Sequence, residues 1–333
     1  MSENRREGVR VSKGVQRSTG KTFHLATRLL PERVRHPTYV LYAFFRLADE
    51  VVDKPDQELG ESERRQLEGI KQVALGDATP EEAVSEGAVL SADTDREVLN
   101  SFREVKEEFD LSDTDVDEFI ESMKADIDTK RYETYSELEG YMRGSAVSVG
   151  RMMTDVMVED ASEETYAHAE ALGEAFQMTN FLRDVREDIT DYGRIYIPRE
   201  TLREANVAES EVEKLEHSPE FADAVRAELR RTDNLYREGV EGIKLLPKDC
   251  QFAVLVASVL YSDYHRLIEK RGYDVLTQEP SLGSLRKLRL VAETYYRWKT
   301  TDEPEEVFYE VSPVSQRYSK KKSKQLATEQ PKV

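Results

Sequence analysis

The feature that most constrains the fold is a run of acidic and amide side chains at helical spacing. If residues 163–190 form one helix, Gln177, Asn180, Asp184 and Asp188 lie at i, i+3, i+7 and i+11 and share one face. An adjoining face is apolar and holds Phe181, Leu182, Val185 and Ile189. Two aspartates at i,i+4 repel each other by about 0.2–0.5 kcal/mol in an isolated helix. The stripe therefore predicts a cation above it.

A second acidic stripe lies earlier in the chain. On a helix predicted over residues 37–54, Tyr42, Arg46, Asp49 and Asp53 share a face. The neighbouring apolar arc consists of Leu41, Phe44, Phe45, Ala48, Val51 and Val52. One such stripe is usually a solvated surface, but two stripes that each border a core face indicate a pair. Facing each other across a cavity, they would hold Mg²⁺, which prefers carboxylate oxygens and is completed by substrate phosphates.

Length and charge limit the classes of protein to consider. The 333 residues suffice for one large all-helical domain or two smaller ones. The net charge of −19 argues against nucleic acid as a partner, since phosphate backbones bind basic surfaces. The acid is spread along the whole chain, which is typical of a protein from a high-salt cytoplasm; an ordinary acidic protein is the alternative.

Cysteine and apolar content indicate the compartment. Cys250 is the only cysteine, so no internal disulfide forms and a reducing cytosol fits. The polar, basic N-terminus has no apolar core of a signal peptide. The longest uncharged apolar run, 252–261, is half of what a bilayer span needs and predicts a buried helix. We expect a cytoplasmic protein, with peripheral membrane contact if its substrate is a lipid.

No segment has the period of a strand, so we expect an all-α protein. Residues 1–17 are predicted to be a flexible N-terminus, 18–300 a helical domain and 301–333 a charged, disordered tail. Asp126 is followed by Asp128 and Lys130, a pattern more typical of a solvated surface than of a site. Further helices are expected over 95–109, 114–130, 219–246, 247–270 and 282–299.

Three shorter segments are candidates for ligand contact. Lys21 and Thr22 lie near a helix start, where they would hold a phosphate or simply cap the helix. The small residues in 144–150, with Tyr141 just before them, permit close approach of a ligand or of another helix. Arg194, next to a diphosphate site, would be an anion clamp.

The two motifs, in this order and with these flanks, resemble the squalene/phytoene synthase family. The resemblance covers about residues 15–300 and is carried by the Tyr42–Asp53 segment, the small residues after Tyr141, the 177–188 segment and the Gly-Arg-Ile-Tyr-Ile-Pro run ending at Pro198. It implies a single-domain, isoprenoid-synthase-type helical bundle around a central cavity. The Asp-Glu-Val-Val-Asp pattern and the Gly-Arg-Ile-Tyr-Ile-Pro run are most similar to the phytoene-forming branch.

The resemblance also implies roles for individual residues. Asp49 and Asp53 match the first aspartate motif, and Asn180, Asp184 and Asp188 match the second; both motifs would bind Mg²⁺, with Mn²⁺ as a substitute. Residues that match diphosphate contacts are Lys21, Thr22, Arg46 and Arg183. Tyr141 and Gln177 match positions near the reacting carbons, and Tyr261 matches a late tyrosine.

Two positions depart from the family pattern. The small segment, which usually reads Val-Ala-Gly, is Ser145-Ala-Val147 here. A late arginine expected after residues 273–276 falls near Gln278 or Glu279, so its phosphate contact would be lost or would pass to Arg286.

The implied reaction is head-to-head condensation of two geranylgeranyl diphosphates to phytoene through a cyclopropyl diphosphate. Charge that collects on diphosphate would be neutralised by the metal and the basic residues. A carbocation must be shielded from water, so the cavity should be apolar and aromatic; the candidates are Phe44, Phe45, Tyr141, Phe176 and Tyr261. No nucleotide-binding pattern is present, so we expect no NADPH requirement. The alternatives are squalene or dehydrosqualene synthesis from farnesyl diphosphate, or a non-catalytic lipid-binding or assembly protein.

Overall fold

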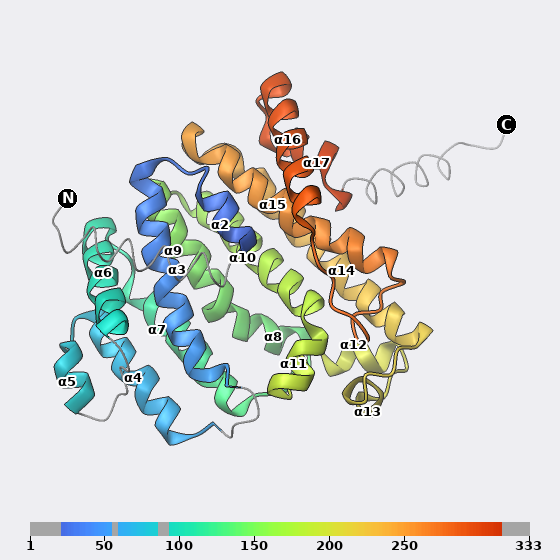
Figure 1. Ribbon diagram of the computed structural model, residues 1–333, viewed down its shortest axis with the longest axis horizontal. Coiled ribbons are helices and arrows are strands. Elements are labelled where there is room, and N and C mark those ends of the chain that lie inside the picture. Colours follow the sequence, from blue (N-terminus) through green and yellow to red (C-terminus); the bar gives the residue numbers. More distant parts are fainter. Residues whose placement is uncertain (1–20, 55–58, 86–92, 315–333) are drawn as a thin grey trace.

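The computed structural model describes residues 21–54, 59–85 and 93–314, and nearly all of them are helical. Within these ranges the β-structure is limited to one isolated bridge between Arg131 and Ile195. The expected all-α class is therefore confirmed (Figure 1).

The helices follow one another through short connections. The first part of the chain forms α2 (Lys21–Thr27), α3 (Glu32–Val52), α4 (Glu61–Leu75), α5 (Pro80–Ser85), α6 (Asp93–Phe109), α7 (Asp113–Asp128) and α8 (Tyr135–Met142). A π-helical turn, Arg143–Val147, leads into α9 (Ser148–Met157), α10 (Glu163–Arg183), α11 (Val185–Tyr192), α12 (Arg199–Glu204) and α13 (Glu209–Glu213). The last part forms α14 (Pro219–Glu241), a 3₁₀ turn (Gly242–Leu245), α15 (Lys248–Lys270), α16 (Ser284–Thr301) and α17 (Pro304–Val311).

Hydroxyl side chains set several helix starts. Each accepts a hydrogen bond from a backbone N–H of the first turn, which satisfies a donor that the helix leaves unpaired. These N-caps are Ser112 of α7, Thr134 of α8, Ser162 of α10 and Ser218 of α14.

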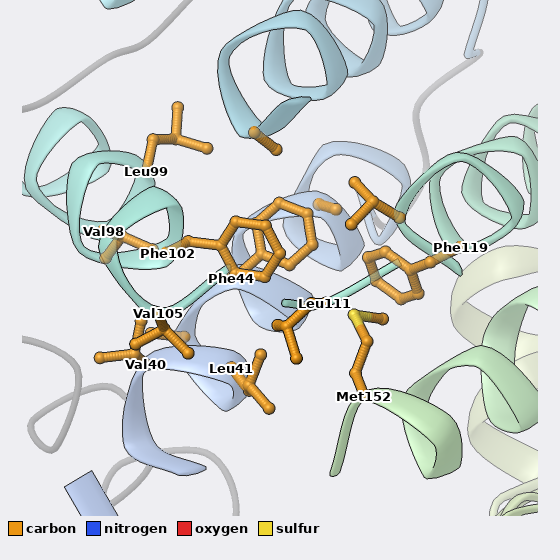
Figure 2. Close-up of a cluster of buried hydrophobic side chains, with 14 of the residues drawn as sticks. Val40, Leu41, Phe44, Val98, Leu99, Phe102, Val105, Leu111, Phe119 and Met152 are labelled. Carbon is orange, nitrogen blue, oxygen red and sulfur yellow. The ribbon is translucent and has the colours of Figure 1, made fainter. Parts of the chain in front are cut away.

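Two large apolar clusters hold the bundle together. In the first, α3 packs against α6 and α7, and the rings of Phe44 and Phe102 stack with centroids 3.8 Å apart (Figure 2). In the second, α10, α14, α15 and α17 pack around Tyr236 and Phe308, both fully buried. α10 contacts α9, α14 and α15 and is central to the bundle (Figure 1). Phe44, a candidate for the cavity wall, is instead part of the first core.

Two predicted boundaries are wrong. α3 begins at Glu32 rather than at residue 37, because Pro37 is accommodated inside the helix. The chain also continues as a packed helix past residue 300: α17 buries Val307 and Phe308 in the second core, where Val314 joins them. The predicted disordered tail therefore does not begin at residue 301. Residues 1–17 and 315–333 lie outside the described part of the chain.

Candidate functional site

The last turns of α3 present an arginine and two aspartates on one face, as predicted. Arg46 Nη1 lies 2.5 Å from Asp49 Oδ2 and 3.6 Å from Asp53 Oδ2. Its Nε donates to Glu50 at 3.1 Å. The guanidinium thus offsets the repulsion between two carboxylates one helical turn apart.

Arg194 joins this end of α3 to two distant segments. Gly193, with φ of 65°, ends α11 and turns the chain so that Arg194 points inward. The Arg194 guanidinium donates to Asp53 Oδ1 and to the Val52 carbonyl, both at 3.1 Å, and to the Asp126 carbonyl at 3.4 Å. Only 4% of Arg194 is exposed. Both terminal nitrogens of its guanidinium donate within the protein, so in this structure Arg194 positions Asp53 rather than acting as the expected anion clamp.

Asp126, whose sequence pattern predicted a solvated surface, is instead buried beside Arg194. It is 3% exposed and accepts a hydrogen bond from Tyr141 Oη at 2.8 Å. Burial raises its pKa to about 6, although Arg194 opposes the shift. The signal was present: Asp126 follows Phe119 and Met123 at i+7 and i+3 on the buried face of α7.

Tyr141 lies in an aromatic cluster rather than on the cavity wall. Its ring lies within 6.2 Å of the rings of Tyr132, Phe181 and Tyr196. Its hydroxyl donates to Asp126, which places it beside the Asp53–Arg194 pair.

The second acidic segment is not the single helix that was predicted. α10 ends at Arg183 and α11 begins at Val185, because Asp184 (φ −101°, ψ 13°) leaves the helical region. Backbone bonds from Asp184 N to Asn180 O and from Asp188 N to Asp184 O, both 2.9 Å, carry the chain across this one-residue break. Gln177 and Asn180 therefore lie on α10, and Asp188 lies on α11.

Arg183 holds Asp184 at the break. Its Nε donates to Asp184 Oδ1 at 2.6 Å, and its Nη2 pairs with the other carboxylate oxygen. The guanidinium lies over the ring of Tyr264, 5.1 Å from its centroid. Arg183 and Asp184 each remain about one-quarter exposed, so the pair is open to a ligand.

The electrostatics link the two acidic segments. Burial, with repulsion from Asp53 next, raises the pKa of Asp49 to about 7. The pKa of Asp188 lies well above its ordinary value because of burial first and the charge of Asp184 second, with a further contribution from Asp53. Carboxylates from α3 and α11 are thus close enough to repel each other, and these two helices lie near each other in Figure 1.

The oxygen donors of this site fit a hard divalent cation. In the described ranges, no three His, Cys, Asp or Glu side chains are already gathered in a geometry that could hold a metal ion. The fit rests on Asn180, whose Oδ1 is buried and accepts no hydrogen bond. A buried, unpaired acceptor is costly, and a cation or its bound water would satisfy it. Asp49 is paired with Arg46, and Asp184 is paired with Arg183. An incoming diphosphate would compete with these carboxylates for the two arginines.

A mostly apolar cavity of about 210 Å³ runs beside α10. One face of α10 lines the cavity from Thr165 to Asn180, with a lining residue every three or four positions. At a rise of 1.5 Å per residue, this face is about 22 Å long. Gln177 and Asn180 lie at one end, and Thr165 and His168 at the other. The remaining wall comes chiefly from Phe23 and Ala26 of α2, Leu30 in the connection after it, Val149 and Met153 of α9, and Ala253, Val254 and Ala257 of α15.

Few of the aromatic candidates line this cavity. Phe176 does so, and Phe23, which was not predicted as an aromatic wall residue, joins it. Tyr261 packs its ring against both, with centroids 4.9 Å from Phe176 and 5.6 Å from Phe23. Phe45 packs against Phe119 in the first core.

The small-residue segment brings two helices into contact, and it also borders the cavity. Gly150 and Gly173 let α9 and α10 touch: a Cβ on either would lie 2.7–2.8 Å from a backbone carbonyl of the facing segment. Ser145 and Ala146 line the cavity at the same place. Close helix contact and part of the cavity wall thus lie at the same place in the bundle.

The remaining candidates are placed as follows. Lys21 and Thr22 begin α2, next to the cavity wall, but their side chains lie outside the described part. Arg286, considered for a late phosphate contact, donates instead to the buried Asp263 at 2.7 and 3.1 Å.

Comparison with known proteins identifies the family of the chain. A family model described as squalene/phytoene synthase matches residues 16–287. The phytoene synthase of Rhodobacter capsulatus is 31% identical over 290 residues, which cover 86% of this chain and 80% of that protein. The phytoene synthase of Cereibacter sphaeroides is 32% identical over 276 residues, 82% of this chain and 75% of that protein.

Solved structures show the same fold. A crystal structure of a dehydrosqualene synthase with a bound ligand matches with a TM-score of 0.75 and 25% identity, over 89% of this chain and 98% of that one. The squalene synthase HpnC from Alicyclobacillus acidocaldarius has a TM-score of 0.69. Among the residues described here, no helix is long and apolar enough to cross a bilayer. By sequence and by fold, the chain belongs to the squalene/phytoene synthase family.

Proposed function

We propose that this prenyltransferase condenses two geranylgeranyl diphosphates head to head to form phytoene in carotenoid biosynthesis. The observation that carries the proposal is the long apolar cavity that ends at Gln177 and Asn180, next to the paired Asp184 and Arg183. The similarity to two bacterial phytoene synthases at 31–32% identity favours the phytoene product.

The chain's own residues would bind and orient the diphosphates. Arg46 and Arg183 are the basic groups beside the two acidic segments, and each is now paired with a carboxylate. Asp49, Asp53, Asn180, Asp184 and Asp188 would hold Mg²⁺, or Mn²⁺ in its place. Bound there, the metal would neutralise charge on the departing diphosphate.

The apolar wall would keep water from the reacting carbons. In the first half-reaction an allylic C–O bond breaks and diphosphate leaves; the double bond of the second substrate forms the new C–C bond, and loss of a proton closes a cyclopropane. In the second, the remaining diphosphate leaves, the skeleton rearranges and a second proton is lost. The products are phytoene, two diphosphates and two protons, with no reductant consumed.

A second candidate is dehydrosqualene or squalene synthesis from farnesyl diphosphate, favoured by the dehydrosqualene synthase fold match. The proposed function also places this enzyme in the cytoplasm with peripheral contact to a membrane, because prenyl chains and a hydrocarbon product partition into lipid.

The test is an incubation of the purified full chain with geranylgeranyl diphosphate and Mg²⁺ in high salt without NADPH, followed by mass analysis of the hydrocarbons. A C40 product supports the proposal. Turnover of farnesyl diphosphate alone would move the assignment to the second candidate. No turnover of either substrate, in a sample with a cooperative melting transition, would favour the non-catalytic alternative.

A further inference from the structure

α16 is unusual because it shows much of its apolar surface to solvent. It buries only Leu290 and Thr294 among its 18 residues. Four large side chains that a solvated helix would not need are exposed: Leu285 (85%), Leu288 (66%), Tyr295 (52%) and Tyr296 (67%). Exposed apolar residues are ordinary when scattered singly, but a contiguous group marks an interaction surface.

These side chains form one stripe. At 100° per residue, Leu285, Leu288, Tyr295 and Tyr296 fall within about 100° of arc, with Ala292 between them. We call these five residues the α16 face. The ring of Tyr295 also lies 5.8 Å from that of Phe252 on α15, which extends the apolar surface.

The opposite side of α16 is fixed to the bundle. Leu290 belongs to the second core, and Arg286 donates two hydrogen bonds to the fully buried Asp263 of α15. Lys248 at the start of α15 pairs with Asp302, just past the end of α16, at 3.1 Å. The α16 face is therefore held in place and directed outward.

Charge indicates the chemistry of the partner. α16 carries five basic residues and one acidic residue, in a chain whose net charge is −19. Lys299 is exposed within the arc of the apolar stripe, and Arg289 is exposed at its edge, 3.9 Å from Glu293. A second copy would present the same predominantly basic helix, which offers these cations no anionic surface of its own. An anionic surface attracts them, and tyrosine is favoured where apolar and aqueous phases meet.

We propose that the α16 face docks on the surface of an anionic lipid bilayer, with the helix axis in the plane of the interface. The observations behind this proposal do not depend on which reaction the protein catalyses. The proposal names the surface that would make the membrane contact included in the proposed function. α15 lies between the α16 face and the apolar cavity. Its Phe252 packs toward α16, while its Ala253, Val254 and Ala257 line the cavity. The docking surface is thus one helix away from the proposed prenyl site.

The test is flotation of the full chain with vesicles made of equal parts of phosphatidylcholine and phosphatidylglycerol. We expect wild type to bind and the Leu285→Ser/Leu288→Ser variant to bind about tenfold more weakly for each leucine. Arg289→Gln/Lys299→Gln should lose about fivefold for each cation at low ionic strength. In about 1 M salt, where the Debye length is about 3 Å, the charge effect should disappear and the leucine effect remain.

Matched controls separate docking from folding and from activity. Val84→Ser on α5 alters another exposed apolar residue and should bind like wild type. Turnover of detergent-dispersed substrate should be unchanged in the leucine variant, so loss of the proposed function and loss of docking are read separately. Wild type that fails to float would overturn the assignment, as would leucine variants that float normally. So would a leucine variant that only converts a dimer into a monomer in sedimentation velocity.

Discussion

The two acidic segments perform similar electrostatic tasks with different construction. α3 runs unbroken to Val52, and Asp53 at its end is held by Arg46 from its own helix and by Arg194 from 141 residues away. α10 ends at Arg183, and Asp184 directly after it forms an ion pair with this sequence neighbour.

This difference in burial means that the Asp53 carboxylate contributes to stability, whereas the Asp184 carboxylate is available for ligand binding. Arg194 is nearly fully buried, so the Asp53 carboxylate is needed by the fold as well as by any ligand. The Asp184–Arg183 pair is partly exposed, and exposed ion pairs contribute little to stability. We therefore expect substitutions at the two segments to have similar effects on turnover and different effects on unfolding.

The largest expected effect is on turnover in Asp184→Asn. Loss of one metal-binding carboxylate should lower the rate of hydrocarbon formation by about 10²–10³, the usual cost of removing one group that stabilises developing charge. The melting temperature should stay at the wild-type value. Asp191→Asn is the control: Asp191 is an exposed aspartate on α11, the short helix that follows Asp184, and this variant should be fully active. Near-normal turnover in Asp184→Asn would remove the metal-site assignment.

Asp53→Asn should lower both turnover and stability, whereas Asp184→Asn should lower turnover alone. Turnover should fall as in Asp184→Asn, and the free energy of unfolding should also drop by about 1–3 kcal/mol, because the buried Arg194 loses a charged acceptor. Urea unfolding of Asp53→Asn, Asp184→Asn and wild type measures this. Equal unfolding free energies for the two variants would contradict the structural role of Arg194.

Metal affinity should depend on pH through the α3 pair. Because the pKa of Asp49 is raised to about 7, its carboxyl holds a proton below that pH, and a metal must displace it. The Mg²⁺ concentration for half-maximal turnover should rise by up to about tenfold from pH 7 to pH 6 and change little above pH 8.

A matched substitution checks the source of this pH effect. The pKa of Glu174 is also raised to about 7 by burial and by neighbouring glutamates, so Glu174→Gln should leave the Mg²⁺ curve unchanged. A metal requirement that does not vary between pH 6 and pH 8 would separate Asp49 from the metal.

The smallest effect is expected for Tyr141→Phe. Removing the hydroxyl that donates to Asp126 should cost about 1 kcal/mol of unfolding free energy and reduce turnover by less than tenfold. A loss of turnover as large as in Asp184→Asn would instead make the Tyr141 hydroxyl a catalytic group.

Periodicity predicted the helices and the face shared by Arg46, Asp49 and Asp53, because these are local properties of one helix. It missed the break at Asp184, since Val185 and Ile189 continue the helical pattern through it. It also missed α17, whose Val307 and Phe308 lie in a charged, proline-containing stretch. The contacts of Arg194 with Val52 and Asp126 join residues 142 and 68 positions apart and leave no local pattern.

Those same contacts have a consequence for how the protein folds. Arg194 donates to acceptors from two distant segments, residues 52–53 and Asp126. Its hydrogen bonds therefore form only after loops of about 70 and 140 residues have closed, which costs chain entropy before the contacts can stabilise the fold. Assembly of the acidic site should therefore be a late event in refolding, after the local helices have formed. A chain that has collapsed with native helix content but has not yet placed Arg194 would have a packed first core and no competent site.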